Sequence, residues 1–423
     1  MSNRIEPIRG MNDILPDQSS DWQFVEKCIR ELLGSYGYGE IRLPLLEKTE
    51  LFARSIGETT DIVEKQMYTF DDRSGNSLTL RPEATASIVR AGITHGLFHN
   101  RQQRLWCMGP MFRYERPQKG RYRQFHQVDV EAIGYEGPDI DAEIIFLSAR
   151  LWRRLGLNDV RLTINSLGTP ESRKTYRTAL VDYFSRHSDQ FDEHSRRRLE
   201  DNPLRILDSK DPGMQELIEK APAITDTLDP DSAEHFNRLC GLLDDVGIAY
   251  TIDPRLVRGL DYYTRTVFEW VTDRLGAQDA VCSGGRYDGL VGQLGGRPTP
   301  AIGWALGLER LVALLSDTGN MPPGPRPHAY LVAAGDSAPR AAMLLAELLR
   351  DRLPGLRLMV NCDGGSFKSQ LKRADRSEAE FAVVLGDEEA VARKAGLKPL
   401  RTDGSQEELG WDDLAARLEQ LIA

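Results

Sequence analysis

Several motifs that would assign a protein class directly are missing from this sequence of 423 residues. Its five cysteines are dispersed with no CxxC pair, so neither a disulfide framework nor a cysteine zinc site is expected. The seven histidines show no HExxH spacing, the pattern of many zinc hydrolases. No apolar run approaches the length that spans a bilayer, and the N-terminal segment lacks the apolar core of a secretory signal. These absences favour a cytoplasmic protein with no membrane association and no metal bound by side chains.

Glycine-rich phosphate loops are also missing, because neither GxxxxGK[ST] nor GxGxxG between a strand and a helix occurs. A nucleotide would therefore have to be held by side chains. The formal net charge of −10 argues against indiscriminate nucleic-acid binding, which needs a broadly basic surface. One local exception is FRYERPQKGRYRQFHQ at 112–127, where residues 113–123 hold five basic side chains and one acidic one. A solvated loop could have this composition, and so could a site for a polyanion.

The order of the expected elements divides the chain in two. Residues 316–327, with four prolines and two glycines, have the composition of a linker. The alternation of strands and helices after it predicts a compact α/β domain at 326–423. The strands expected before it are 78–83, 104–115, 124–134, 158–164, 262–271 and 278–284. Since several follow one another without a crossover helix, residues 1–325 are expected to form an antiparallel α+β sheet, with a charged helical insertion at about 170–247.

Side-chain alternation gives three of these strands a polar face. Arg113 and Glu115 share one face of their strand. The other aligned sets are Thr79, Arg81 and Glu83, and Phe125, Gln127, Asp129 and Glu131. A solvent-facing antiparallel sheet would alternate in the same way, but the combination of arginine, carboxylates and an aromatic ring favours a binding site. His126 falls on the opposite face and is interpreted as structural.

The segment PAIGWALGLERLVALL at 300–315 predicts a helix with Gly303, Gly307 and Arg310 along one stripe. Glycine inside a helix costs about 1 kcal/mol relative to alanine, so two on one stripe call for a reason. Close approach of a ligand is one reason, and tight helix–sheet packing is another. Because a guanidinium can bind phosphate oxygens bidentately, Arg310 and Arg113 are candidates for holding a nucleotide.

Segments along most of the chain resemble the motifs of the class II aminoacyl-tRNA synthetases and, within that class, of the histidyl-tRNA synthetase family. Residues 112–127 resemble motif 2, which holds ATP, and AIGWALGLERL at 301–311 resembles motif 3. GYGEIRLPLLEKTELF at 37–52 resembles motif 1, which forms the dimer interface in this family. The remaining matching segments are RGMNDILP, LTLRPEATA, LVRGLDYYTRTVFEW and GGRYDGL. The resemblance begins near Ile8, reaches the C-terminus and leaves out only the helical insertion.

The resemblance implies a class II catalytic core at 1–325 and an α/β anticodon-binding domain at 326–423. The implied activity is that of a histidine–tRNA ligase, which activates L-histidine with ATP to histidyl-adenylate and pyrophosphate. Histidine is then transferred to the 3′-terminal adenosine of tRNA(His). The implied cofactors are ATP, which is a substrate, and Mg²⁺ held through its phosphates. The implied partners are tRNA(His) and a second copy of the chain in a homodimer.

The resemblance also implies roles for single residues. Arg258 would be catalytic, placing positive charge on the α-phosphate, and Arg113 would hold that phosphate beside the histidine carboxylate. Glu115 would accept from the adenine amino group, with Phe125 stacked on the ring. The residues implied for histidine are Glu83, Thr85, Arg113, Gln127, Glu131, Arg258, Tyr262, Tyr263 and Tyr287. Those implied for ATP are Arg113, Glu115, Arg121, Phe125 and Arg310, and those implied for the tRNA acceptor end are Arg116, Gln118 and Arg123.

Two alternatives stay open at this point. The first is a non-catalytic paralogue of the same fold, the regulatory subunit of ATP phosphoribosyltransferase. That subunit typically lacks the C-terminal domain and an intact RGLDYYT segment, whereas both are present here. The second is a generic RNA-binding protein that uses the basic loop, which would leave the carboxylates Glu83 and Glu131 unexplained. One departure from the family is Ala84, where many members have glycine; its methyl group would tighten the pocket without removing it.

Overall fold

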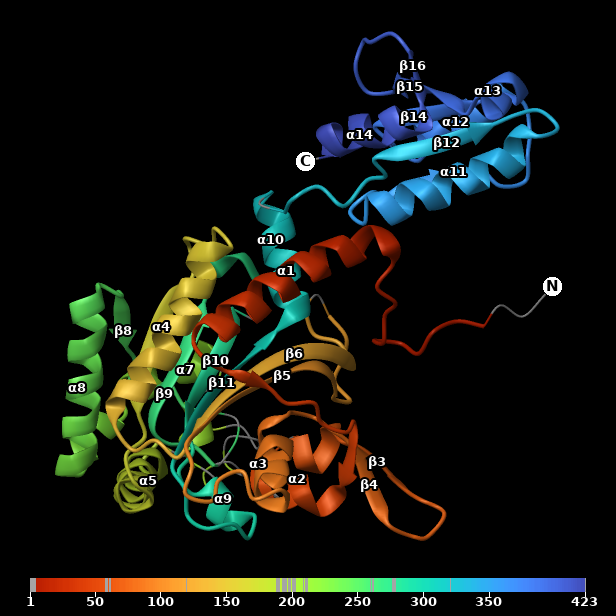
Figure 1. Cartoon of the computed structure of the whole chain (residues 1–423). Coiled ribbons are helices and arrows are strands. Elements are labelled where there is room, and N and C mark those ends of the chain that lie inside the picture. The colour runs from red at the N-terminus through yellow and green to blue at the C-terminus, as the bar shows by residue number, and fades with distance from the viewer. Residues whose placement is uncertain are drawn as a thin grey trace. The chain divides into compact units, whose positions relative to one another are not determined.

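The computed structural model describes residues 5–57, 60, 62–118, 120–187, 191, 196, 199, 203–207, 209, 212–258, 260, 262–275, 279–319 and 321–422. The chain divides into two compact units, Met1–Pro322 and Pro323–Ala423 (Figure 1). In the described part of the chain, no helix is long and apolar enough to cross a membrane.

The larger unit is built on an eight-stranded sheet with the order β1-β5-β6-β11-β10-β9-β7-β8. The strands are β1 (Gly39–Glu40), β5 (Gln103–Phe112), β6 (Gln124–Ile133), β7 (Arg161–Ser166), β8 (Tyr250–Ile252), β9 (Thr264–Val271), β10 (Ala280–Arg286) and β11 (Ala301–Gly307). All neighbouring pairs are antiparallel except β1 with β5 and β7 with β8, at the two ends of the order. This arrangement confirms the predicted antiparallel α+β sheet. Position 278, in one expected strand, lies outside the described residues.

Four helices cover one face of this sheet: α1 (Pro16–Ser35), α4 (Pro138–Arg154), α8 (Pro230–Val246) and α10 (Leu308–Thr318) (Figure 1). In α4 the buried side chains of Ile140, Ile144, Leu147 and Leu151 recur at helical spacing and so form one stripe. Pro138 at its first turn has no N–H to leave unpaired. Burial of each such side chain contributes about 1.5–3 kcal/mol, so this layer supplies much of the core.

The opposite face of the sheet carries a second layer, formed by α3 (Thr85–Thr94), α5 (Pro170–Ser185), α7 (Pro212–Glu219) and α9 (Leu290–Gln293). Three short helical turns, η3 (Pro203–Ile206), η4 (Ile224–Thr227) and η5 (Asp273–Leu275), are also described. The described residues of the expected insertion are therefore mainly helical, but its two parts pack on opposite faces of the sheet. Its first part packs with Tyr262 and Tyr263, whereas α8 packs with α4 on the other face.

A small second sheet beside this layer has the order β2-β4-β3, with β2 (Leu46–Lys48), β3 (Tyr68–Asp71) and β4 (Ser77–Leu80). Helix α2 (Thr49–Ile56) and the π-helical turn η1 (Ile62–Gln66) accompany it. The strand expected at 78–83 therefore ends at Leu80 and belongs to this second sheet, while the carbonyl of Arg81 accepts from the backbone N–H of Phe112 at the end of β5. The hydroxyl of Thr79 contacts those of Thr49 and Thr69 at 2.9 and 3.0 Å, and Arg81 donates to the carbonyl of Pro110.

The predicted helix at 300–315 is wrong in its first half. Residues 301–307 form the central strand β11, and only Leu308–Thr318 are helical. A short apolar run cannot be assigned to helix or strand by periodicity alone, and here the sheet register decides. Gly303 lies opposite Glu131 on β6 and Gly285 on β10, so the supposed helical stripe does not exist.

The smaller unit has a five-stranded sheet with the order β13-β12-β14-β15-β16, parallel among the first three strands and antiparallel after them. Its strands are β12 (Ala329–Ala333), β13 (Leu358–Val360), β14 (Phe381–Leu385), β15 (Lys394–Pro399) and β16 (Glu407–Gly410). Its helices are α11 (Ala338–Arg352), α12 (Phe367–Arg376), α13 (Asp387–Ala392) and α14 (Trp411–Ile422). The alternating α/β pattern is confirmed, and the antiparallel strands β15 and β16 complete the sheet.

Candidate active site

A cavity of about 260 Å³ brings together the polar face of β6, the loop after β5 and the ends of β10 and β11. Its lining includes every residue expected to contact histidine or ATP: Glu83, Thr85, Arg113, Glu115, Arg121, Phe125, Gln127, Glu131, Arg258, Tyr262, Tyr263, Tyr287 and Arg310. The three residues expected to contact the tRNA acceptor end, Arg116, Gln118 and Arg123, do not line it. The cavity therefore gathers two of the three predicted groups, while the roles of their members stay predictions.

Carboxylates occupy one end of the cavity. Glu131 on β6 is buried and accepts from the hydroxyls of Thr85 at 2.6 Å and Tyr287 at 2.5 Å. Glu83, in the turn before α3, accepts from the backbone N–H of Ala86 at 3.0 Å through Oε1. Its Oε2 is buried and has no hydrogen-bond partner among the residues that the structure describes. An acceptor left open in this way fits a donor that arrives with a ligand.

Burial raises the pKa values of these carboxyl groups. The pKa of Glu131 rises to about 8, with Asp129 and Glu83 adding to the effect of burial. The pKa of Asp129 also rises to about 8, from burial and the charge of Glu83, and burial raises the pKa of Glu83 itself. A cationic ligand would oppose these shifts, because it stabilises the ionised forms. In the described part of the chain, no group of His, Cys, Asp or Glu side chains is arranged to hold a metal ion.

Gly303 makes room for the Glu131 carboxylate. A Cβ on this residue of β11 would overlap Oε2 of Glu131, its neighbour across the strand pair. Aromatic rings form the adjoining wall, with the rings of Tyr262 and Tyr287 meeting edge to face at 5.6 Å between centroids. Gly303, which the sequence analysis assigned to a helix, is thus explained by the sheet: the absence of a side chain there leaves space for the carboxyl group of Glu131.

Guanidinium groups occupy the other end. Arg113 donates to the carbonyl of Pro82 at 2.9 Å, and its guanidinium lies 5.1 Å from the centroid of the Phe125 ring. Glu115 pairs with Arg121 at 2.5 Å. Arg310, on the first turn of α10, donates to the carbonyls of Gly120 and Ala280 at 3.0 and 2.8 Å. These contacts place the Arg113 guanidinium beside the Phe125 ring and hold Arg310 against the loop at Gly120, and guanidinium groups can bind the oxygens of an anion.

The loop that carries this end is closed by a tight turn. Gln118 and Arg121 exchange backbone hydrogen bonds of 3.0 and 2.9 Å, and Gly120 adopts φ of 73°, a conformation that favours glycine. Arg123 stacks on the Tyr114 ring at 4.0 Å and donates to the carbonyl of Glu115, so its side chain braces the base of the loop. Arg116 and Gln118 are exposed, and Lys119 lies outside the described residues.

Arg258 reaches the cavity from the segment before β9. It donates to the hydroxyl of Ser283 at 2.8 Å and to the carboxylate of Glu269, and it lies over the ring of Tyr263 at 5.6 Å. The positive charge of Arg258 is therefore paired with an acidic side chain in this structure. Glu269 and Ser283 face each other across β9 and β10, a pairing that no local pattern in the sequence indicates. Asp261, its expected neighbour, lies outside the described residues.

Two further residues test the alternation rule. Asp129 lines the cavity, and the rule had placed it on the correct face although it was left out of the predicted site. His126 lies outside the cavity, with Nδ1 2.9 Å from Glu309 and its ring edge-on to Trp22. Its assignment to the opposite face is therefore confirmed, since Val128 and Val130 beyond it are buried in the core.

Known proteins resemble the chain along its whole length. The family profile described as Histidyl-tRNA synthetase matches residues 10–311, and the Anticodon binding domain profile matches 328–421. The histidine–tRNA ligase of Halorhodospira halophila is 61% identical over 423 residues, which is 100% of both chains. That of Alkalilimnicola ehrlichii is 60% identical over 427 residues, covering 100% of this chain and 99% of the other.

Solved structures agree with these relatives. The structure of apo S. aureus histidyl-tRNA synthetase superposes with a TM-score of 0.82 at 38% identity, covering 98% of this chain and 100% of that one. The agreement extends through both compact units and includes the sheet that forms the cavity. The chain belongs to the histidyl-tRNA synthetase family.

Proposed function

We propose that the chain is a histidine–tRNA ligase that activates L-histidine with ATP and then transfers histidine to the 3′-terminal adenosine of tRNA(His). The observation that carries this proposal is the polarity of one cavity, which has buried carboxylates at one end and guanidinium groups at the other. An amino acid with a cationic amine and imidazole N–H groups matches the first end. A nucleoside triphosphate, with its negatively charged phosphates, matches the guanidinium end. The full-length relatives named as histidine–tRNA ligases support the same reading.

The histidine pocket follows from the open acceptors. Glu83 Oε2 would receive the α-ammonium group, because no described residue donates to it. Glu131, held by Thr85 and Tyr287, would receive an imidazole N–H, and Gln127 has a buried carbonyl oxygen that is also open among the described residues. A pocket of buried hydrogen-bonding groups rejects analogues without matching donors by roughly 10⁴–10⁵, since its own groups are then left unpaired.

ATP would lie at the guanidinium end. Phe125 offers a ring face for the adenine, Glu115 an acceptor for its amino group, and Arg310 a positive charge for the phosphates. Arg121 would exchange its contact with Glu115 for one with a phosphate. Mg²⁺ would come with ATP, held through its phosphates, and would offset part of their negative charge. Each charge-assisted hydrogen bond would contribute about 1.5–3 kcal/mol.

Activation then requires positioning and charge stabilisation. A carboxylate oxygen of histidine attacks the α-phosphorus, the bond to the bridging oxygen breaks, and pyrophosphate leaves with that oxygen. The attacking group is already an anion, so no base is needed. Arg113 and Arg258 would stabilise the charge on the α-phosphate, since preorganised donors act most strongly where charge develops. In the second step a ribose hydroxyl of tRNA attacks the histidyl carbonyl, and AMP leaves.

The remaining assignments concern larger parts of the chain. Residues 1–325 would form the catalytic domain and 326–423 the domain that reads the anticodon. The exposed Arg116 and Gln118, with Arg123 at the loop base, would approach the acceptor end of the tRNA. A homodimer through 37–52 and a cytoplasmic location rest on family resemblance.

Histidine-dependent ATP–pyrophosphate exchange tests the proposal. Among the standard amino acids only histidine is expected to support exchange. Arg258→Ala should lower the rate by roughly 10²–10³, the cost of removing one transition-state donor. Arg255→Ala, an exposed arginine paired with Asp253, is the matched control and should leave exchange unchanged. Full exchange by the Arg258 variant, or binding of histidine without any exchange by the wild type, would contradict the proposal; the second outcome is the one expected of the regulatory paralogue.

A further inference from the structure

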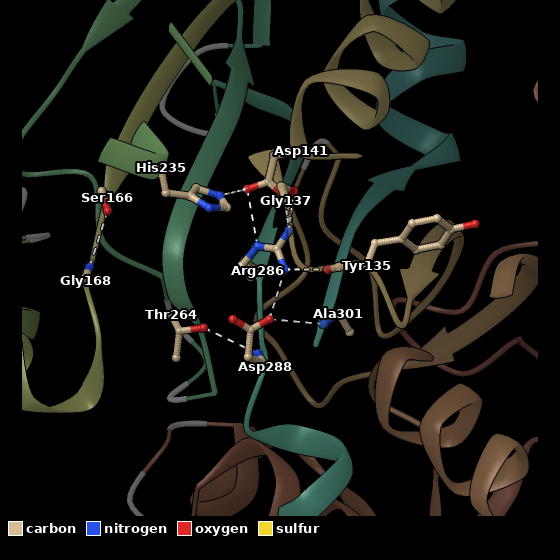
Figure 2. Close-up of polar contacts among 10 residues, drawn as sticks. All are labelled: Tyr135, Gly137, Asp141, Ser166, Gly168, His235, Thr264, Arg286, Asp288 and Ala301. Carbon is tan, nitrogen blue, oxygen red and sulfur yellow. Dashed lines mark hydrogen bonds and ion pairs between the residues drawn. The ribbon is translucent and has the colours of Figure 1, made fainter. Parts of the chain in front are cut away.

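A buried ionic network includes Arg286 and Asp288, the two chain neighbours of the cavity-lining residue Tyr287 (Figure 2). At its centre is Arg286, the last residue of β10, whose side chain is fully buried. A guanidinium has five N–H groups, and those of Arg286 donate to five oxygen atoms on four residues. Nε and Nη2 donate to the two carboxylate oxygens of Asp141, Nη1 donates to the carbonyl of Tyr135 and to Asp288, and Nη2 also donates to the carbonyl of Gly137.

His235 completes this network from α8. Its Nε2 lies 2.8 Å from Oδ2 of Asp141, and both side chains are buried. Burial alone would raise the pKa of Asp141, but the Arg286 guanidinium and the His235 hydrogen bond lower it below its usual value. An ionised carboxylate can only accept hydrogen bonds, so Nε2 of His235 carries a hydrogen and donates the hydrogen bond to Asp141. The three residues come from β10, α4 and α8, which are far apart in the sequence.

The network is joined to the cavity through a three-residue turn, Arg286–Asp288. Tyr287, between its two charged residues, donates through its hydroxyl to Glu131 at 2.5 Å and through its backbone N–H to the carbonyl of Ala301 at 2.7 Å. Asp288 accepts from the backbone N–H of Ala301 at 3.1 Å. Its own N–H donates to the hydroxyl of Thr264 at 3.3 Å. The turn is thus tied to the first residues of β9 and β11.

We propose that Arg286, Asp141 and His235 are positioning residues for histidine selection. They touch no part of the cavity themselves, because none of them lines it. They hold the turn against α4 and α8, and the turn holds the Tyr287 hydroxyl on Glu131. The inference rests on the proposed role of Glu131 in binding histidine.

A purely structural network would make a different prediction. Replacing a buried ion pair by apolar residues often leaves stability unchanged, so the network needs a reason beyond stability. If it only stabilised the fold, a variant would lose activity toward histidine and ATP in proportion to the protein that unfolds. If it positions Tyr287, the KM for histidine should rise while the KM for ATP stays near its wild-type value.

The test uses His235→Phe and His235→Gln in the intact chain. His235→Phe keeps an aromatic ring but removes the donor to Asp141, and we expect about a tenfold rise in the KM for histidine, the scale of one hydrogen bond to a charged group. His235→Gln places an amide N–H near the position of Nε2 and should restore the KM. Leu239→Ala on the same helix is the matched control: Leu239 is fully buried in the core, so its truncation should destabilise α8, and it has no polar group with which to join the network.

The outcomes separate the possibilities. A histidine-specific KM effect in His235→Phe, absent from Leu239→Ala and reversed in His235→Gln, supports the inference. Equal effects on both substrates, or the same effect in Leu239→Ala, overturn it. If His235→Phe does not fold, Asp288→Ala, which removes a partly exposed partner of Arg286, gives the same discrimination. Tyr287→Phe and Glu131→Gln are measured in parallel: if neither raises the KM for histidine, the proposed pocket itself is wrong, and the inference falls with it.

Discussion

The two ends of the cavity are built in different ways. At the carboxylate end, both oxygens of Glu131 accept hydrogen bonds from neutral hydroxyls, and the residue lies near the end of β6 with only 1% of its surface exposed. At the guanidinium end, Arg121 projects from a loop between β5 and β6, and 41% of its side chain is exposed. At the carboxylate end the side chains are positioned by the sheet and the ionic network around Arg286. At the guanidinium end they are positioned by a loop and the first turn of α10.

This difference matches what each end would have to do. Selecting one small amino acid requires polar groups that are buried and already oriented, because only an unpaired buried group penalises the wrong ligand strongly. A triphosphate carries enough charge to be held by arginines that move to meet it. The loop also has exposed polar residues, Arg116 and Gln118, that do not line the cavity. The more deeply buried end is therefore the one where discrimination would be required.

The largest effect is expected from breaking the carboxylate end. In Glu131→Gln the amide places an N–H where a hydroxyl now donates, so the pocket loses an acceptor for the ligand. We expect the KM for histidine in pyrophosphate exchange to rise by roughly 10–100-fold, the scale of a hydrogen bond to a charged group. The KM for ATP should stay near its wild-type value, since Glu131 lies at the far end from Arg310.

A companion variant tests the same end of the cavity without replacing a polar side chain. Gly303→Ala inserts a Cβ into the space of the Glu131 carboxylate, so it should raise the KM for histidine in the same direction. Gly289→Ala, where a Cβ meets nothing within 4 Å, is the control and should behave as wild type. Equal loss of affinity for histidine and ATP in Gly303→Ala would show that the strand, rather than the pocket, had been disturbed.

A smaller effect is expected at the guanidinium end. Phe125→Leu keeps an apolar side chain but removes the ring that would stack on adenine, a contact worth about 0.5–1.5 kcal/mol beyond burial. The KM for ATP should rise by roughly 2–10-fold, and the KM for histidine should change little. Titration of each substrate at saturating levels of the other measures both values. A rise confined to histidine would reverse the assignment of the two ends.

Much of this contrast could be read from local sequence. Alternation along 124–134 placed Gln127, Asp129 and Glu131 on one face, and the cavity contains all three. The basic loop, its proline and its glycine were also visible locally. A period of two and a turn residue act over a few positions, so they survive in the sequence as direct signals.

The parts that failed depend on contacts between distant segments. Residues 301–307 form a strand because they pair with β6 on one side and β10 on the other. The composition of these seven residues alone does not indicate that pairing. Arg258 meets Glu269 and Ser283 only once β9 and β10 are in register. Apart from the contact of Arg286 with Asp288, the side-chain contacts of the network join residues 94 to 151 positions apart, so no short window of sequence contains it.

The last expected effect concerns the pH dependence of stability in the ligand-free protein. Asp129 has a pKa of about 8 in the folded chain against an ordinary value of 3.8. Between these values the folded state keeps a proton that the unfolded state has lost. The contribution to stability is therefore greatest at low pH and is lost as the pH rises through about 8.

Asp129→Asn removes this titration while keeping the size of the side chain. The melting temperature of the wild type should fall between about pH 5 and pH 8, and the slope should be shallower in the variant, with at most ~1.4 kcal/mol per pH unit removed. Glu234→Gln, an exposed carboxylate on α8, is the control and should leave the slope unchanged. A slope that Asp129→Asn leaves intact would mean that Asp129 is already ionised at neutral pH. The carboxylate end would then be less isolated from solvent than its burial indicates, and its contrast with the loop end would lie in geometry alone.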